Sequence, residues 1–293
     1  MGTKDVMEKT LESYNDVFSD IVNTLLFDGK RIVREDDLED QNVRSYYKMH
    51  DKVHEMERDV AKKWKMGDIR VACIGMENQS KSDPDMPLRV IGYDGAAYRE
   101  QLLKNQTGNR YPVVTLVLYF GKEKWKYSTS LVESLGVPKE LKPYVNDYKI
   151  NLFQIAHLSQ DQIDKFQSDF KVVADYFKHM DDDGYRPSAE EFRHPGETLE
   201  LLAAMSNDRR FIEERYDEFG REVKNMSSVL DRIELKGMEK GRAEEEEKNI
   251  KRLNIMKITI AGNLYKSGVP IKNIAKIMEI SESEVEDLLQ IPH

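Results

Sequence analysis

The stretch Ile69-Arg70-Val71-Ala72-Cys73-Ile74-Gly75-Met76-Glu77-Asn78-Gln79 decides the fold of this 293-residue chain. Its first part is strongly apolar and its end is polar, which predicts a buried strand that delivers polar side chains to the edge of a sheet. Side chains alternate along a strand, so Glu77 and Gln79 share one face. A second acid, Asp59, precedes Glu77 by 18 residues (77 − 59) and lies in another expected strand, residues 53–64.

The connection between the two strands decides whether these acids meet. We expect a hairpin closed by the three-residue loop Met66-Gly67-Asp68, in which glycine supplies the unusual backbone angles. Glu57 would then pair with Glu77, and Asp59 would lie diagonal to Glu77 on the same face, roughly 7–8 Å away between Cα atoms. A two-residue loop would instead place Asp59 on the opposite face.

Two carboxylates at this separation favour a divalent cation. Mg²⁺ prefers oxygen ligands and is usually held by one or two carboxylates together with waters and substrate phosphates. We therefore expect Asp59 and Glu77 to hold an ion that activates water against a phosphodiester. Gln79 could orient that water, but it lacks the positive charge of the lysine that is common at this position of such sites. The alternative, on spacing alone, is a surface hairpin with ordinary charges.

The composition is that of a chain with a substantial core and no membrane segment. Apolar residues make up 39% and charged residues 34%, and no apolar run approaches the roughly 20 residues that span a bilayer. The start of the chain lacks the apolar region of a signal peptide. The single cysteine, Cys73, excludes a disulfide framework and a cysteine-based zinc site. We therefore expect a cytoplasmic protein.

The charge is uneven along the chain, whose net charge is −9. Residues 61–126 carry 12 Lys and Arg against 7 Asp and Glu, whereas residues 177–250 carry 13 against 20. Phosphate binding needs a local positive patch rather than a positive total. The segment with Glu77 therefore fits a DNA-facing surface, although an asymmetry of this size is also common by chance.

The remaining pattern of the first half predicts a mixed sheet between helices. Apolar residues recur at helical spacing over residues 4–27, where Asp16 lies beside the apolar stripe, and a second helix runs from about Pro87 to Leu103. Residues 111–121 form an apolar strand typical of a central position covered on both faces. Residues 34–50 are polar and predict a loop with a short helix. The order of these elements predicts an α/β fold, a mixed central sheet flanked by helices.

The second half is helical in pattern. Residues 152–177 have helical periodicity, residues 188–235 suggest two or three helices, and residues 236–247 form a charged, helix-prone linker. Residues 271–289 resemble a helix-turn-helix with Ser281 as N-cap. The second helix of this pair carries acids and no Lys or Arg, so we interpret it as a packing or self-association element rather than a DNA reader.

Other signatures of chemistry are missing from the sequence. The six histidines show no spacing typical of zinc sites. No glycine-rich phosphate loop, dinucleotide-binding fingerprint or nucleophile elbow is present. These absences leave the paired acids as the main candidate for chemistry.

Five blocks of the sequence belong together: Asn15-Asp16-Val17-Phe18, Arg58-Asp59-Val60, Gly75-Met76-Glu77-Asn78-Gln79, Met86-Pro87-Leu88-Arg89-Val90-Ile91-Gly92-Tyr93-Asp94 and Tyr111-Pro112-Val113-Val114-Thr115-Leu116-Val117-Leu118-Tyr119-Phe120-Gly121. In combination they resemble the Rpn family of recombination-promoting nucleases, transposase-like members of the PD-(D/E)XK nuclease superfamily. The resemblance covers roughly residues 4–180. Each block alone is weak, and only the set is specific.

The resemblance implies a mixed sheet with flanking helices, a Mg²⁺ or Mn²⁺ site, and cleavage of DNA. It implies that Asp59 and Glu77 bind the metal and that Gln79, at a position where the wider superfamily has Lys, completes the catalytic set. It assigns supporting roles to three more residues, Asp16, Arg89 and Tyr93. The last two would contact phosphate and water. Modest activity is implied, because activation of the water is left to the metal and its neighbours.

The leading hypothesis is therefore a Mg²⁺-dependent DNA endonuclease that promotes recombination. One alternative is a DNA-binding or regulatory protein on a nuclease fold with weak or no catalysis. Another is a scaffold that forms homo-oligomers through its C-terminal helices. We expect three parts: a nuclease-like domain over residues 1–180, a helical region over residues 181–236, and a charged helix with a helix-turn-helix-like tail over residues 237–293.

Overall fold

The computed structural model describes residues 11–41, 44–49, 52–57, 59–67, 69–103, 110–182, 184–217 and 219–289. The chain divides into two compact units, Met1–Leu230 and Asp231–His293. The expected boundaries at residues 180 and 236 stay predictions.

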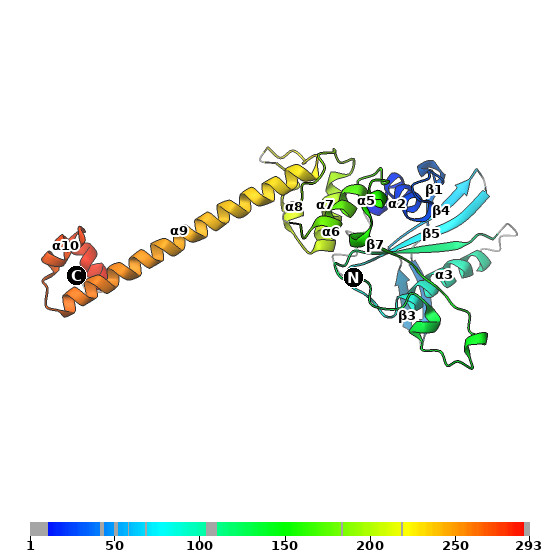
Figure 1. The fold of residues 1–293 in the computed structure, drawn as a ribbon, viewed down its shortest axis with the longest axis horizontal. Helices are drawn as coiled ribbons and strands as arrows, with labels where there is room; N and C mark the ends of the chain where they lie inside the picture. The colour runs from blue at the N-terminus through cyan, green and yellow to red at the C-terminus, as the bar shows by residue number, and fades with distance from the viewer. Residues whose placement is uncertain are drawn as a thin grey trace. The chain divides into compact units, whose positions relative to one another are not determined.

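Five strands form the central sheet of the first unit: β1 (Leu38–Asp40), β4 (Val60–Met66), β5 (Ile69–Gln79), β6 (Val113–Tyr119) and β7 (Asn151–Gln154). Their order in space is β1-β4-β5-β6-β7 (Figure 1). The pairs β1–β4 and β4–β5 are antiparallel, whereas β5–β6 and β6–β7 are parallel. β5 therefore joins the antiparallel hairpin to the parallel half of the sheet, and its Cys73 is buried as expected.

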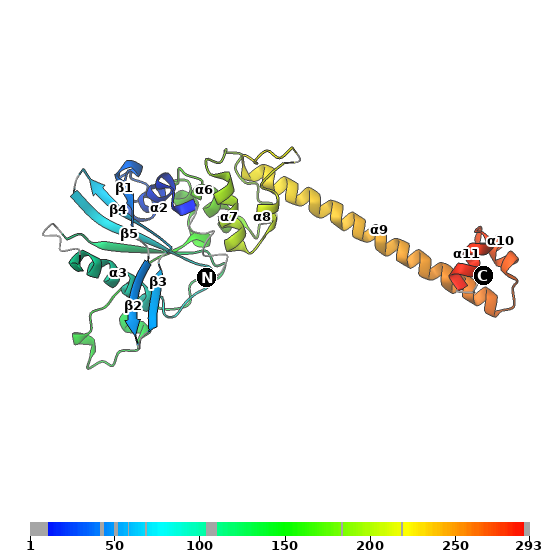
Figure 2. The same ribbon diagram turned by 180° about the vertical axis from the view of Figure 1, so that it is seen from behind.

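Helices cover both faces of this sheet (Figures 1 and 2). On one face, α3 (Met86–Leu103) packs against Val117 of β6. On the other face lie α2 (Asn15–Phe27) and α6 (Phe170–His179). The ring of the first residue of α6 lies 6.3 Å from the ring of Phe120, centre to centre. The expected architecture, a mixed sheet flanked by helices as in a PD-(D/E)XK core, is confirmed.

Burial explains why these segments take these forms. In α2, Val17, Phe18, Ile21 and Val22 recur at helical spacing and are 0% exposed. β6 is buried along nearly its whole length, as expected for a central strand. Burying each such apolar side chain stabilises the fold by roughly 1.5–3 kcal/mol. These two elements therefore hold in place the sheet on which β5 presents its polar end.

The expected N-terminal helix is interrupted within the described residues. The expected helix over residues 4–27 falls partly on residues 1–10, which lie outside the described residues. A turn at residues 13–14 then separates residues 11–12 from α2. The helix ends at the expected place, where Asp28 and Gly29 have φ of 54° and 80°. The backbone N–H of Gly29 donates to the carbonyl of Asn23 at 2.9 Å, which satisfies an acceptor at the helix end.

The region before β4 contains more strands than expected. In addition to β1 and β4, the described residues of this region form a 3-10 helix and two more strands: η1 (Glu35–Asp37), β2 (Arg44–Met49) and β3 (Lys52–Glu57). β2 and β3 make a separate two-stranded sheet. The predicted pairing of Glu57 with Glu77 is therefore wrong, because Glu57 pairs with Arg44. Strand formation depends on partners distant in sequence, so the local polar pattern was a poor guide.

The expected helix over residues 152–177 also begins as a strand. β7 extends the parallel sheet, with Leu116 of β6 opposite Asn151. It is followed by η3 (Ile155–His157), α5 (Gln160–Ile163) and α6. The long connection from β6 to β7 contains α4 (Leu131–Ser134) and η2 (Lys142–Tyr144) within mostly irregular chain. The helical pattern thus predicted α6 correctly and missed the strand before it.

The next helices after α6 are α7 (Pro195–Ser206), α8 (Arg210–Glu213) and α9 (Met226–Lys266), whose residues belong partly to the first unit and partly to the second. The segment that leads into α7 is anchored by Asp169, which is 6% exposed. Its Oδ2 accepts hydrogen bonds from the backbone N–H groups of Arg193 and His194, at 2.9 and 2.6 Å. A buried carboxylate thus ties this segment to the start of α6.

The second unit contains a small helical core. α10 (Ile271–Met278) and α11 (Glu282–Leu289) form the expected helix-turn-helix-like pair. Their buried apolar residues gather with a residue of α9: Ala261, Ile274, Ala275 and Val285. Oγ of Ser281 accepts from the backbone N–H of Glu284 at 3.2 Å, so the predicted cap is confirmed. Across the described part of the chain, no helix has the length and apolar character needed to cross a membrane.

Candidate functional site

The hairpin of β4 and β5 brings Asp59 and Glu77 together. Val60 pairs with Met76, so Asp59, one residue earlier, lies opposite Glu77, one residue later. A hydrogen bond holds this arrangement, because Oδ2 of Asp59 accepts from the backbone N–H of Asn78 at 2.6 Å. The structure thus places the two expected metal ligands at the same end of the hairpin.

The loop that sets this register differs from the prediction. Met66 pairs with Ile69, so the loop has two residues instead of three. Such a loop alone would put Asp59 on the face opposite to Glu77. The register shifts, however, by one residue next to Trp64. This β-bulge reverses the facing of the residues beyond it, and Asp59 returns to the face of Glu77.

Three further side chains converge on Oε1 of Glu77, a residue that is 2% exposed. Arg89 of α3 forms an ion pair with this atom through Nη2. The hydroxyl of Tyr93, one helical turn later, lies 3.5 Å from it, and Nε2 of Gln79 donates at 3.3 Å. Asp83 binds the other end of the Arg89 guanidinium, through Nη1 at 3.0 Å. The structure therefore gathers Gln79, Arg89 and Tyr93 around Glu77.

Burial and charge fix the protonation of the two α3 side chains. Burial alone would lower the pKa of Arg89, but the charge of Glu77 and the contacts with Tyr93 and Asp83 raise it above its ordinary value. Burial raises the pKa of Tyr93, and the charge of Glu77 raises it further. Arg89 therefore remains a cation at neutral pH, and Tyr93 remains a neutral hydrogen-bond donor.

The donor set suits a hard divalent cation. Asp59 and Glu77 offer carboxylate oxygens, the ligand type that Mg²⁺ prefers, in the number it usually takes. Among the described residues, no group of three or more His, Cys, Asp or Glu is placed to hold a metal ion. Waters and substrate phosphates would therefore complete the coordination. Because Arg89 already pairs with Glu77, a bound metal would compete with this arginine.

A buried acid on the opposite face of β5 was not predicted from the sequence. Glu12 is 0% exposed, and its Oε2 accepts from Nδ2 of Asn78 at 2.7 Å. The side chain of Asn78 alternates with those of Glu77 and Gln79, so it leaves the sheet on the other face. A signal was present, because Glu12 lies one helical turn before Asp16 in the segment predicted as helix.

Asp16 belongs to a different cluster. Its two carboxylate oxygens lie 3.2 and 3.1 Å from Nε2 of His194, and one of them lies 3.8 Å from Nη1 of Arg193. α2, which carries Asp16, covers the sheet face opposite to α3 (Figures 1 and 2), whereas Glu77 faces α3. The structure therefore does not bring Asp16 to the Asp59–Glu77 pair.

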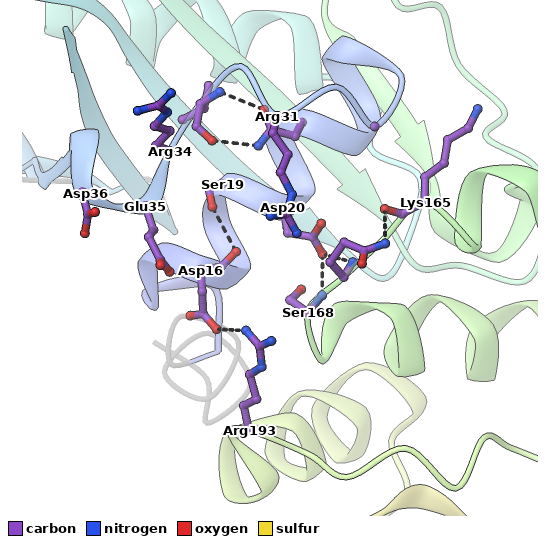
Figure 3. Close-up of a pocket in the computed structure, with 14 residues that line it drawn as sticks. Asp16, Ser19, Asp20, Arg31, Arg34, Glu35, Asp36, Lys165, Ser168 and Arg193 are labelled. Carbon is purple, nitrogen blue, oxygen red and sulfur yellow. Dashed lines mark hydrogen bonds and ion pairs between the residues drawn. The ribbon is translucent and has the colours of Figure 1, made fainter.

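A pocket of about 530 Å³ opens beside Asp16 (Figure 3). Charged residues of both signs line it, among them Asp16, Asp20, Arg31, Arg34, Lys165 and Arg193. Asp20 is occupied by the protein itself, since its carboxylate accepts from the backbone N–H groups of Gln167 and Ser168, each at 2.8 Å. The mixture of acids and bases favours neither sign of ligand, so we assign this pocket no role in the chemistry.

Comparison with known families identifies the family of this chain. Residues 24–206, more than half of the 293-residue chain, match the family model described as "Putative transposase, YhgA-like". The chain belongs to the YhgA-like transposase family. The match confirms the resemblance drawn from the sequence blocks. It contains five of the six expected site residues of this YhgA-like chain, and Asp16 lies before it. No curated protein and no solved structure matches the chain.

Proposed function

We propose that this YhgA-like protein is a metal-dependent endonuclease that hydrolyses phosphodiester bonds of DNA and thereby promotes recombination. The observation that carries the proposal is the β4–β5 register, which sets Asp59 opposite Glu77. The family description, which names a transposase, supports DNA as the substrate. The basic character of residues 61–126, 12 Lys and Arg against 7 Asp and Glu, agrees with a polyanionic partner.

Asp59 and Glu77 would hold a Mg²⁺ or Mn²⁺ ion through their carboxylate oxygens. When bound, such an ion lowers the pKa of a coordinated water and offsets the charge that develops on the phosphate. The protein orients the two ligands in advance. Asp59 is held by the backbone N–H of Asn78 at 2.6 Å, and Glu77 is held by Arg89 and its neighbours. Ligands fixed in this way lose little entropy when they bind.

The remaining side chains have separate roles in this proposal. Gln79 accepts or donates hydrogen bonds and would orient the attacking water, but it cannot carry charge. Arg89 is 39% exposed, so part of its guanidinium faces solvent, where a DNA phosphate would bind it. Tyr93, kept neutral by burial and by Glu77, would donate to water or phosphate. Substrate binding therefore rests on Arg89, and water orientation on Gln79.

Nicking of supercoiled plasmid in Mg²⁺ or Mn²⁺ tests the proposal. Asp59→Asn and Glu77→Gln keep the shape of each side chain and remove its charge, and both should abolish nicking, as should a chelator. Asp36→Asn is the matched control, because Asp36 is an exposed acid in the same unit and should leave nicking unchanged. Equal nicking by all four proteins would refute the site, since the activity would then come from elsewhere.

Two observations favour a second candidate, a DNA-binding or regulatory protein with weak or no catalysis. Arg89 already neutralises Glu77, and Gln79 supplies no positive charge for the attacking water. The same plasmid experiment separates the two functions. Gel retardation of the plasmid by wild-type protein, without nicking under any metal condition, would support the binding protein over the nuclease.

We also infer that α9 mediates self-association. This 41-residue helix exposes Ile250, Leu253, Met256 and Ile260 by 52, 57, 58 and 43%. Their spacing of three and four residues places them along one stripe, as in a helix that pairs with another helix. Leu253→Asp combined with Met256→Asp should lower the molar mass measured by light scattering. Lys251→Asp is the control, because Lys251 is exposed on the other side of α9, and an unchanged mass in the double variant would exclude this stripe.

A further inference from the structure

The segment Gly121-Lys122-Glu123-Lys124-Trp125-Lys126-Tyr127 begins two residues after the end of β6 and forms neither helix nor strand. Lysine occurs at every second position in it, and aromatic residues stand between and after the last two lysines. The proposed function counts these lysines in the charge of residues 61–126 but gives none of them a role. Its three lysines against one acid stand out in a chain whose net charge is −9.

Contacts place this segment beside the candidate site. Tyr119, the last residue of β6, pairs with Gln79 of β5, and the backbone N–H of the following residue donates to the carbonyl of Gln79 at 2.8 Å. The ring of Trp125 packs edge-on against the ring of Tyr119, with 5.1 Å between their centres. Oγ of Ser82 lies 3.4 Å from the hydroxyl of Tyr119. Ser82 precedes Asp83, the second partner of Arg89, so the segment adjoins the residues around Glu77.

The lysines of this segment are available to a ligand. Lys124 is exposed and makes no ion pair or side-chain hydrogen bond with the described residues. Within the part of the chain that the structure describes, Lys126 pairs with Glu123, and their side chains are 63% and 71% exposed. Lys122 pairs with Asp181 at 2.5 Å, again with both side chains more than half exposed. Exposed pairs of this kind contribute little to stability, so a phosphate can displace the acids at low cost.

The two aromatic residues of the segment differ in exposure. Trp125 is partly buried. Its backbone N–H donates to Oε1 of Gln154 at 2.7 Å, and its side chain packs against the core cluster that contains Val90 and Val117, which fixes the segment to the sheet. Tyr127 is 45% exposed. A duplex needs only cations along its backbone, whereas an exposed aromatic face among cations suits an unpaired base. The three lysines together with the exposed ring of Tyr127 therefore suit single-stranded DNA better than duplex DNA.

We propose that residues 122–127 bind a single-stranded part of the DNA substrate, with Lys122, Lys124 and Lys126 on its phosphates and Tyr127 stacked on an unpaired base. The inference rests on the proposed nuclease function and adds that the DNA substrate is single-stranded where it binds this segment. An unpaired stretch at the site would be cleaved where it passes Glu77. Duplex DNA would reach the same position only where its strands separate.

Fluorescence anisotropy of the full-length protein tests this binding without cleavage, in buffer containing EDTA. The probes are a labelled oligothymidylate longer than the roughly 4–16 nucleotides that such sites cover and a labelled duplex of equal length. Tyr127→Ala should weaken binding of the single strand about tenfold, in line with the loss of one stacked base, and should leave duplex binding nearly unchanged. Tyr127→Phe should restore the affinity.

The lysines have their own readout. Lys124→Ala combined with Lys126→Ala should weaken binding and should lower the salt dependence of the affinity by about 0.7 in log–log slope for each lost phosphate contact. Lys139→Ala combined with Tyr144→Ala is the control, because both residues are exposed in the same unit. Unchanged single-strand binding in Tyr127→Ala, or equal losses in the control, would overturn the inference. Because no metal is present, failure of nicking does not affect this test.

Discussion

Replacing Arg89 by Gln should tighten metal binding at the Asp59–Glu77 pair while abolishing DNA cleavage. Arg89 pairs with Oε1 of Glu77, so a divalent cation must compete with its guanidinium. Gln keeps an amide donor at this position and removes the positive charge. Cleavage should be lost in the same variant, because the phosphate would no longer meet a cation on α3.

The size of the effect follows from Coulomb's law and the exposure of Arg89. Two unit charges about 4 Å apart interact by about 4 kcal/mol at an effective dielectric constant near 20. The Arg89 side chain is 39% exposed, so solvent screens much of this energy. If about one third remains, roughly 1.4 kcal/mol, the dissociation constant for the metal should fall about tenfold.

Isothermal titration calorimetry with Mn²⁺ measures this constant for wild type, Arg89→Gln and Arg99→Gln. Arg99 is a matched control because it lies on α3, is exposed, and makes no ion pair with the described residues. Its replacement changes the net charge equally. An unchanged constant in Arg89→Gln would refute the competition between arginine and metal. An equal change of the dissociation constant in both variants would mean that the loss of one positive charge from the protein, rather than the loss of the pair with Glu77, causes the effect.

Three further predictions concern stability and are checked by chemical denaturation. Burial raises the pKa of Asp20 above its ordinary value of 3.8 in the folded protein. The free energy of unfolding of the wild type should therefore fall, relative to that of Asp20→Asn, as the pH rises from about 4 through the folded-state pKa. Parallel pH profiles of the two proteins would contradict this prediction. Asp169→Ala should lower the free energy of unfolding by about 2–4 kcal/mol, because two backbone donors lose their acceptor, and a loss under 1 kcal/mol would contradict it. Phe18→Ala should cost about 3–5 kcal/mol, because the ring is fully buried.

Much of the core could be predicted because its patterns are local. The apolar run of β6 and the helical stripe of α2 record burial directly in the order of residues. The capped pair at the C-terminus was also found, since Ser281 and Glu284 satisfy each other within one turn. The common face of Asp59 and Glu77 was predicted, but from a three-residue loop, whereas the structure reaches it through a two-residue loop and a bulge next to Trp64.

The missing parts depend on contacts that no short pattern encodes. β7 is half-buried and only four residues long, and its neighbours make it a strand by pairing with β6. The bulge next to Trp64 is a local irregularity that no sequence pattern marks. A three-residue loop without a bulge would place Asp59 on the same face, so the sequence could not distinguish the two solutions. The role of Glu12 required the break in the helix at residues 13–14 to be known.

The position of Cys73 allows the opening of β5 to be measured in the unmodified protein. It is the one cysteine of the chain and is 2% exposed, on the same strand face as Glu77. A thiol reagent reaches it only when β5 separates from its neighbours, so the labelling rate of the unmodified protein measures the free energy of that opening. A cation or DNA strand bound at Glu77 would stabilise the closed strand and slow the labelling. Ligand affinity at the site can thus be read from a native thiol, without an attached dye or a substitution.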